Sequence, residues 1–178
     1  MAKMGKFSAS DLKKLQKKLN KIQEKELNTL SESIVKELAA RLLAKVVKRT
    51  PVGDYSKEIT VVAKRDSKKH KKGESYTKRI NPSGKQGGTL RRGWTGGEKI
   101  DVGEYNSFLS VEHIGENFVI EIINPVEYAS YVEYGHRTRD HQGWVQGRFM
   151  LTISEQEVQE IAPNVIEAKI QKFLMDIF

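Results

Sequence analysis

Hydrophobic residues recur every three or four positions along the first third of the chain. The apolar positions are Leu12, Leu15, Leu19, Ile22, Leu27, Leu30, Ile34, Leu38, Leu42 and Val46. This spacing places about one apolar residue per turn on the same face of an α-helix. We predict a long amphipathic helix over residues 11–48, with Ser8 or Ser10 as its cap and a candidate break near Asn28. Pro51 ends it, because the residue before a proline is driven out of the helical region.

The first half of this helix carries a narrow leucine seam among many lysines. The basic residues are Lys13, Lys14, Lys17, Lys18, Lys21 and Lys25. Three interpretations stay open for them: a solvated helix face, a seam for a partner or neighbouring subunit, or contact with phosphate.

A second helical pattern closes the chain. After Arg148, apolar residues again recur at helical spacing: Phe149, Leu151, Ile153, Val158, Ile161, Val165, Ile166, Ile170, Phe173, Leu174 and Ile177. We predict one or two amphipathic helices here, with Pro163 at a kink or in a first turn.

The middle of the chain favours short strands. Ile59, Val61 and Val62 indicate one strand. Two further apolar runs, over residues 108–114 and 118–123, flank a turn at 115–117 and predict an antiparallel hairpin. The predicted fold class is therefore α+β: a long N-terminal helix, a small twisted antiparallel sheet and a C-terminal helix.

Residues 64–92 contain 11 Lys or Arg residues and two acidic ones, interspersed with Gly, Ser and Asn. Such a stretch has few apolar groups to offset its ordering entropy, so we predict a basic mobile insertion at about 64–88. Charge is also divided along the chain, because residues 1–92 carry a net +16 and residues 93–178 a net −8. This asymmetry suits a basic arm for nucleic acid or an attraction between identical subunits.

The length of 178 residues predicts a single domain, 1–178, with a substantial core. There is no Cys, which excludes disulfides and Cys-ligated metals. No apolar run reaches the ~18 residues of a membrane span, and the N-terminus lacks a secretory hydrophobic region, so we expect synthesis in the cytoplasm and no membrane partner.

The sequence supports none of three enzyme chemistries. Glu133 and His136 have Glu-x-x-His spacing, and His141 and Asp140 lie close by, but a carboxylate-bridged metal site needs a second such pair. No Gly-x-Ser-x-Gly elbow occurs for a serine nucleophile. The glycines after residue 84 do not complete a phosphate loop, since Lys85 is followed by Gln rather than Ser or Thr. We expect no enzyme, no cofactor and no metal.

The most informative stretch is residues 127–151. Tyr128, Tyr131, Val132 and Tyr134 have helical spacing, and Gly135 can adopt the positive φ that ends a helix. A charged loop follows, and then Trp144 and the sequence Gly-Arg-Phe-Met-Leu.

The pattern YAxYVEYGHRT at residues 128–138, followed by GRFML at 147–151, resembles the hallmark segment of bacteriophage tail-component, or head–tail joining, proteins. Two shorter motifs agree with it: Thr-Pro-Val-Gly at residues 50–53 and Leu-Arg-Arg-x-Trp at residues 90–94. In that family the two usually lie close together, whereas here about 35 residues separate them. The resemblance covers about residues 30–178 and extends to tail completion proteins of defective prophages and to minor tail protein Z.

The resemblance implies a structural protein of the virion neck or tail, made in the host cytoplasm, that completes the tail and joins it to the head. Its copies would form a ring, expected to be six-fold, and bind other neck and tail proteins. The residues expected at assembly interfaces are Arg91, Arg92, Trp94, Tyr131, Tyr134, His136, Arg137, Arg139, Trp144, Arg148 and Phe149. For each of them, core packing of the aromatic residues and solvation of the charged ones stay open as alternatives.

The alternative function is sequence-independent binding of nucleic acid. The basic insertion could follow a phosphate backbone, with Tyr76 available to stack on a base. The residues for contact with phosphate or with an acidic protein surface are Lys68, Lys69, Lys71, Lys72, Lys78 and Arg79. Tight DNA binding would obstruct DNA exit through a neck, so an acidic protein surface is favoured, with DNA contact at most transient.

Overall fold

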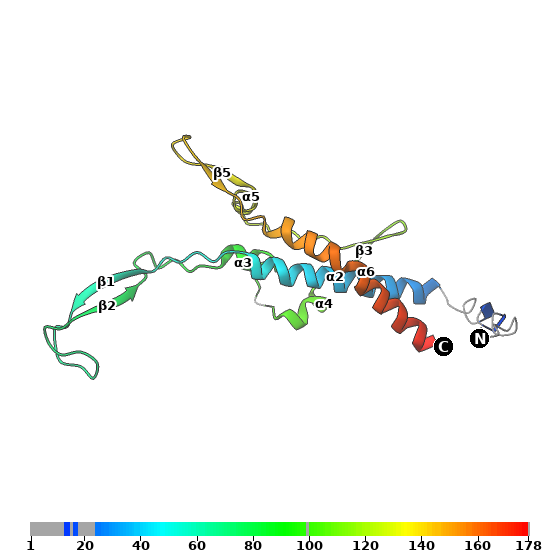
Figure 1. Cartoon of the computed structure of the whole chain (residues 1–178), viewed down its shortest axis with the longest axis horizontal. Helices are drawn as coiled ribbons and strands as arrows, with labels where there is room; N and C mark the ends of the chain where they lie inside the picture. The colour runs from blue at the N-terminus through cyan, green and yellow to red at the C-terminus, as the bar shows by residue number, and fades with distance from the viewer. Residues whose placement is uncertain (1–12, 15, 18–23, 99, 178) are drawn as a thin grey trace, which may run out of the picture.

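The computed structural model describes residues 13, 14, 16, 17, 24–98 and 100–177. Two long helices, α2 (Glu24–Arg49) and α6 (Met150–Ile177), pack side by side and form the body (Figure 1). Four short helices lie between them in sequence: α3 (Thr89–Gly93), η1 (Val102–Glu104), α4 (Tyr105–Phe108) and α5 (Ala129–Tyr134). Since an isolated helix is only marginally stable in water, the apolar stripes of α2 and α6 need each other.

The core lies where α2, the start of α6, α3 and α4 converge. Its buried members are Ala39, Leu43, Val46, Leu90, Trp94, Tyr105, Leu109 and Met150. Leu43, Val46 and Met150 are fully buried. Burying a side chain of this size contributes roughly 1.5–3 kcal/mol to folding. The core therefore packs the two long helices together with the short helices that lie between them in sequence.

The strands form three separate antiparallel hairpins rather than one sheet. They are β1 (Lys57–Val62) with β2 (Ser75–Ile80), β3 (Glu112–Ile114) with β4 (Asn117–Val119), and β5 (Gly135–Arg137) with β6 (Trp144–Gln146). The β1–β2 hairpin extends away from one end of the helix pair, and the β5–β6 hairpin projects above it (Figure 1). The α+β fold class is confirmed, with its strands in projecting arms.

The helix predictions are confirmed in type and corrected in detail. α2 runs without a break through Asn28, and α6 continues through Pro163 as one helix. Residues 13, 14, 16 and 17 are helical, whereas the predicted caps at Ser8 and Ser10 lie outside the described residues, as do residues 11, 12, 15 and 18–23. Packing of α2 along α6 supplies the continuity that local sequence alone did not predict.

The strand predictions were right in position, but β1 is longer than predicted and the strands of the second hairpin are shorter. β1 covers the predicted strand, and the predicted hairpin exists as β3–β4. Phe108 is not in a strand, because it ends α4, whose Tyr105 is buried in the core. The segment after Val119 leaves the ladder to pack Ile120 and Ile122 against the core.

The basic insertion has regular structure, contrary to the loop expected there. Residues 75–80 form β2, which pairs with β1 along its whole length, and α3 begins at Thr89. The sequence pattern missed β2 because its residues are mostly polar and the strand is exposed, so no buried face produces an alternation. Mobility of residues 64–88 stays a prediction.

Candidate functional site

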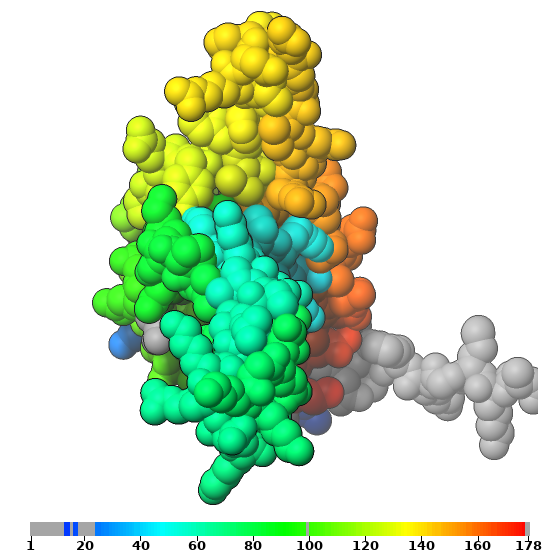
Figure 2. Space-filling view, turned by 90° about the vertical axis from the view of Figure 1, so that its left-hand side faces the viewer, coloured from blue at the N-terminus to red at the C-terminus, as the bar shows by residue number. Residues whose placement is uncertain are grey.

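The segment with α5, β5 and β6 forms an arm that stands out from the body; we call it the aromatic arm (Figure 2). Gly135 ends α5 with φ of 87°, a conformation that a side chain would strain. A Cβ on Gly135 would lie 2.4 Å from the Val145 carbonyl oxygen, and one on Gly147 would lie 2.2 Å from that of Glu133. The two glycines therefore allow the hairpin backbone to pack directly on the end of α5.

Glu133 joins this arm to the body. Its side chain is buried at 6% exposure, and its two carboxylate oxygens accept hydrogen bonds from the backbone N–H groups of Leu151 and Thr152, both at 3.0 Å. The Thr152 hydroxyl donates a third, at 2.8 Å. Those N–H groups are the free donors at the start of α6, where a negative charge also meets the positive end of the helix dipole. Glu133 is thus the cap of α6.

The loop between β5 and β6 is held by hydrogen bonds of its own. The Thr138 hydroxyl donates to the Asp140 carboxylate at 2.5 Å and accepts the Gly143 N–H at 2.9 Å. The Thr138 hydroxyl and the Gln142 N–H stabilise the charged carboxylate and lower the pKa of Asp140. A short hairpin closed in this way presents its outer side chains in a defined arrangement.

The aromatic arm exposes large apolar side chains. Tyr131 is 57% exposed, Tyr134 63% and Trp144 62%. The tyrosines come from α5 and the tryptophan from β6. Exposed aromatic side chains mark a candidate interaction site, because Tyr and Trp are enriched where interfaces are tightest.

Three predicted arginines surround these aromatic residues in sequence and are exposed: Arg137, Arg139 and Arg148. His136 is half-buried; its Nδ1 lies 3.5 Å from the Tyr131 carbonyl oxygen. Phe149 is also half-buried and immediately precedes α6 with φ of 49°. The structure therefore brings eight of the predicted interface residues into the aromatic arm or its junction with α6. Whether they contact another chain stays a prediction.

The remaining three predicted interface residues lie elsewhere, beside Thr50. Trp94 is buried, and its indole N–H donates to the Thr50 hydroxyl oxygen at 2.7 Å. The Arg91 guanidinium donates twice to the Thr50 carbonyl oxygen, at 3.1 and 2.6 Å. Arg92 is half-buried next to them. The Thr-Pro-Val-Gly and Leu-Arg-Arg-x-Trp motifs thus meet in space, and Trp94 takes the core position that the sequence left open as an alternative.

The inserted hairpin carries the predicted phosphate contacts at and near its tip. Lys68, Lys69, Lys71 and Lys72 are exposed, and no ion pair between described residues involves them. Lys78 is exposed on β2. Tyr76 and Arg79, by contrast, have partners within the chain.

Tyr76 stacks on His70 with ring centroids 4.1 Å apart, and Arg79 pairs with Asp54. Both side chains are occupied by these contacts. The stacking platform and one cation of the nucleic-acid hypothesis are therefore engaged within the hairpin.

No group of metal-ligating side chains occurs in the described part of the chain. Glu133, the first candidate ligand, uses both carboxylate oxygens to cap α6. Across residues 13, 14, 16, 17, 24–98 and 100–177, no helix has the length and apolar character needed to cross a bilayer.

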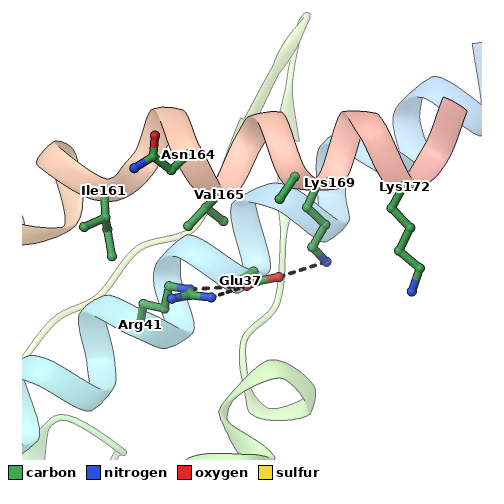
Figure 3. A pocket seen from close by; sticks show the side chains of 8 residues that line it. Glu37, Arg41, Ile161, Asn164, Val165, Lys169 and Lys172 are labelled. Carbon is green, nitrogen blue, oxygen red and sulfur yellow. Dashed lines mark hydrogen bonds and ion pairs between the residues drawn. The ribbon is translucent and has the colours of Figure 1, made fainter. Parts of the chain in front are cut away.

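A shallow groove runs between α2 and α6, and Glu37 lies at its centre (Figure 3). One carboxylate oxygen of Glu37 accepts from Arg41 at 2.6 Å, and the other pairs with Lys169 at 3.0 Å. These partners lower the pKa of Glu37. Further along the body, Glu157 bridges Lys45 and Arg49. Both ion-pair clusters link or support the two long helices.

Sequence inspection missed the structural importance of Thr50, Asn124 and Gly147. The Asn124 side-chain NH2 donates to the Leu90 carbonyl oxygen at 2.8 Å. A Cβ on Gly93 would lie only 2.2 Å from the Asn124 side-chain oxygen, so Gly93 leaves room for this side chain. A signal existed for Gly93 and Gly147, since each lies within a short motif. None existed for Asn124 or for the Glu133 cap, because their partners are distant in sequence.

A protein-family model matches residues 13–135 of the chain. The matching family is described as "Bacteriophage HK97-gp10, putative tail-component". The match includes the Thr50 and Trp94 motifs, the inserted hairpin and α5, and it ends at Gly135. No match was found among curated proteins or solved structures.

Proposed function

This chain belongs to the bacteriophage HK97-gp10 tail-component family, and from that premise we propose that it completes the tail and joins it to the head. A tail component is a structural protein of the virion. In the proposed role, identical copies form a ring, six-fold as the resemblance implies, and this ring binds other neck and tail proteins. Ring closure lets many modest contacts add together.

One observation supports this function above others: the exposed aromatic surface on a rigidly held arm. Tyr131, Tyr134 and Trp144 are each more than half exposed, while the backbone beneath them is fixed by the Glu133 cap and by close packing at Gly147. A surface that is apolar and pre-organised loses little conformational entropy on binding. We assign to the aromatic arm the contact with a neighbouring neck or tail protein.

The charged residues around this patch suit the rim of the same contact. Arg137, Arg139 and Arg148 are exposed and close in sequence to the aromatic residues. Arginine at an interface can pair with carboxylates or stack on aromatic rings. Arg91 and Trp94 support the function indirectly, by holding Thr50 and the core in place.

The first test is electron microscopy of particles made with the gene for this chain deleted. We expect unjoined heads and tails, or tails of uncontrolled length. Normal joined particles would refute the proposed function. The intact phage is the control.

The second test places the function on the aromatic arm. Trp144→Ala with Tyr134→Ala should leave the chain folded and abolish joining, because both side chains are largely exposed. Val102→Ala is a matched control, since Val102 is 66% exposed and lies outside the arm. Joined particles at the intact level with the double variant would remove the arm from the assembly step.

A further inference from the structure

The β1–β2 hairpin has one apolar face flanked by lysines. The register pairs Lys57 with Ile80, Ile59 with Lys78 and Val61 with Tyr76. Residues that pair directly lie on the same face, and successive residues alternate between faces. Lys57, Ile59, Val61, Tyr76, Lys78 and Ile80 therefore share one face, which we call the basic hairpin face.

The β3–β4 hairpin has a face of opposite charge. Glu112 pairs with Val119 and Ile114 pairs with Asn117, so these four share a face, with Glu116 in the turn beside them. We call this set the acidic hairpin face. Ile114 is 58% exposed and Val119 37%, and no ion pair in the described residues involves Glu112 or Glu116.

The other face of β3–β4 is turned to the body. The His113 ring nitrogen lies 3.0 Å from a Glu32 carboxylate oxygen on α2, and His113 contacts the Phe118 ring edge-on at 4.5 Å. The acidic hairpin face is therefore the side opposite to His113 and Phe118. Its Ile114 is largely exposed, whereas Val119 also lines a shallow groove beside α2.

The two faces lie at opposite ends of the body. Glu32, which holds β3, is near the start of α2, whereas the β1–β2 hairpin follows the end of α2 at Arg49 (Figure 1). The helix between residues 32 and 49 is about 25 Å long at 1.5 Å per residue. The two faces thus meet each other only between copies.

We propose that the basic hairpin face of one copy packs on the acidic hairpin face of the next copy. This inference rests on the proposed ring, and it names the contact that builds it. Each face has an apolar centre, Ile59 and Val61 on one and Ile114 and Val119 on the other. Each also has charges of one sign at its edge, lysines against glutamates.

The contact is head-to-tail, because different faces meet. A head-to-tail contact leaves one face of each kind unused on a dimer, so addition continues until a ring closes. A two-stranded hairpin is marginal alone, so covering its apolar face also stabilises the projecting arm. The opposite net charges of residues 1–92 and 93–178 act in the same direction.

The chain has no cysteine, so cysteines can be introduced without background. In tails purified from infected cells, the double variant Ile59→Cys with Val119→Cys should give a ladder of covalent oligomers on treatment with a short bismaleimide. Each single variant should stay monomeric. Val62→Cys with Val119→Cys is the matched control, because Val62 is 54% exposed on the opposite face of β1 and should give no ladder.

A charge exchange gives an independent measurement. Lys57→Glu with Lys78→Glu should reduce incorporation into particles at least tenfold, as should Glu112→Lys with Glu116→Lys. The chain that carries all four changes should regain incorporation. Lys48→Glu with Lys172→Glu, two exposed lysines of the long helices, is the control and should assemble normally.

Three results would overturn the contact. They are a dimer from Ile59→Cys alone, a cross-link from Ile59→Cys to a different tail protein, and particles that contain the double-cysteine chain but give no ladder. Each leaves the proposed function standing. If the intact chain is missing from particles, the proposed function fails and the contact fails with it.

Discussion

The Glu133 cap provides the sharpest test of how the aromatic arm is held. Glu133→Gln keeps the shape of the side chain and one acceptor oxygen. Its NH2 group, however, replaces the oxygen that accepts a hydrogen bond from one of the two backbone N–H groups, so that bond is lost. Hydrogen bonds to a charged group contribute roughly 1.5–3 kcal/mol each. Loss of the charge at the helix start removes about 0.3–1 kcal/mol more. We expect Glu133→Gln to lower the free energy of unfolding by about 2–4 kcal/mol.

Urea denaturation followed by circular dichroism measures this loss. With a slope of about 2 kcal/mol per molar urea, the midpoint should fall by about 1–2 M. Glu155→Gln is the matched control, because Glu155 is an exposed residue of the same helix with no hydrogen bond or ion pair in the described residues. Equal midpoints for the two variants would show that the buried carboxylate does not stabilise α6. The reasoning about the arm would then be wrong.

The remaining predictions concern the core, the hairpin packing and the ion pairs. Trp94→Phe removes the hydrogen bond to Thr50 and should cost about 1 kcal/mol in thermal or urea unfolding, whereas the exposed Trp144→Phe should cost nothing measurable. Gly147→Ala places a methyl group 2.2 Å from the Glu133 carbonyl oxygen, so we expect loss of particle joining, and joining at the intact level would contradict the close packing. Hydrogen bonds from Lys45 and Arg49 to the carboxylate lower the pKa of Glu157. The stability from this carboxylate is therefore complete above its ordinary pKa and is lost as pH falls through the lowered value. Glu157→Gln should weaken that acid dependence in urea titrations at pH 3 to 5.

The physical reason why an element could or could not be predicted from the sequence differs from element to element. α2 and α6 were predictable because a buried stripe forces apolar residues to recur at helical spacing. α5 was predictable from the helical spacing of its residues and the glycine that ends it, although its tyrosines are exposed. β1 was predictable from its β-branched residues. β2 was not, because most of its residues are polar and exposed and its pairing depends on β1 rather than on its own composition.

The candidate site divides in the same way. The aromatic residues of residues 127–151 were found from sequence, because exposed tyrosines and a tryptophan around a glycine form a local pattern. The sequence could not decide that Trp94 is buried while Trp144 is exposed. Each tryptophan directly follows a glycine in the sequence. Only the fold packs α2 against Trp94 and leaves Trp144 uncovered.

Sequence by itself determined the two long helices near the ends of the chain, the division of charge and the family of this chain. Tertiary structure alone decided that Thr50 joins Arg91 and Trp94, that Glu133 caps a helix 17 residues further on, and that two hairpins of opposite charge lie at opposite ends of the body. The physical reason is range. Periodicity and turn chemistry act between neighbours, whereas a cap, a core contact or a charged face depends on which distant segments the packed helices bring together.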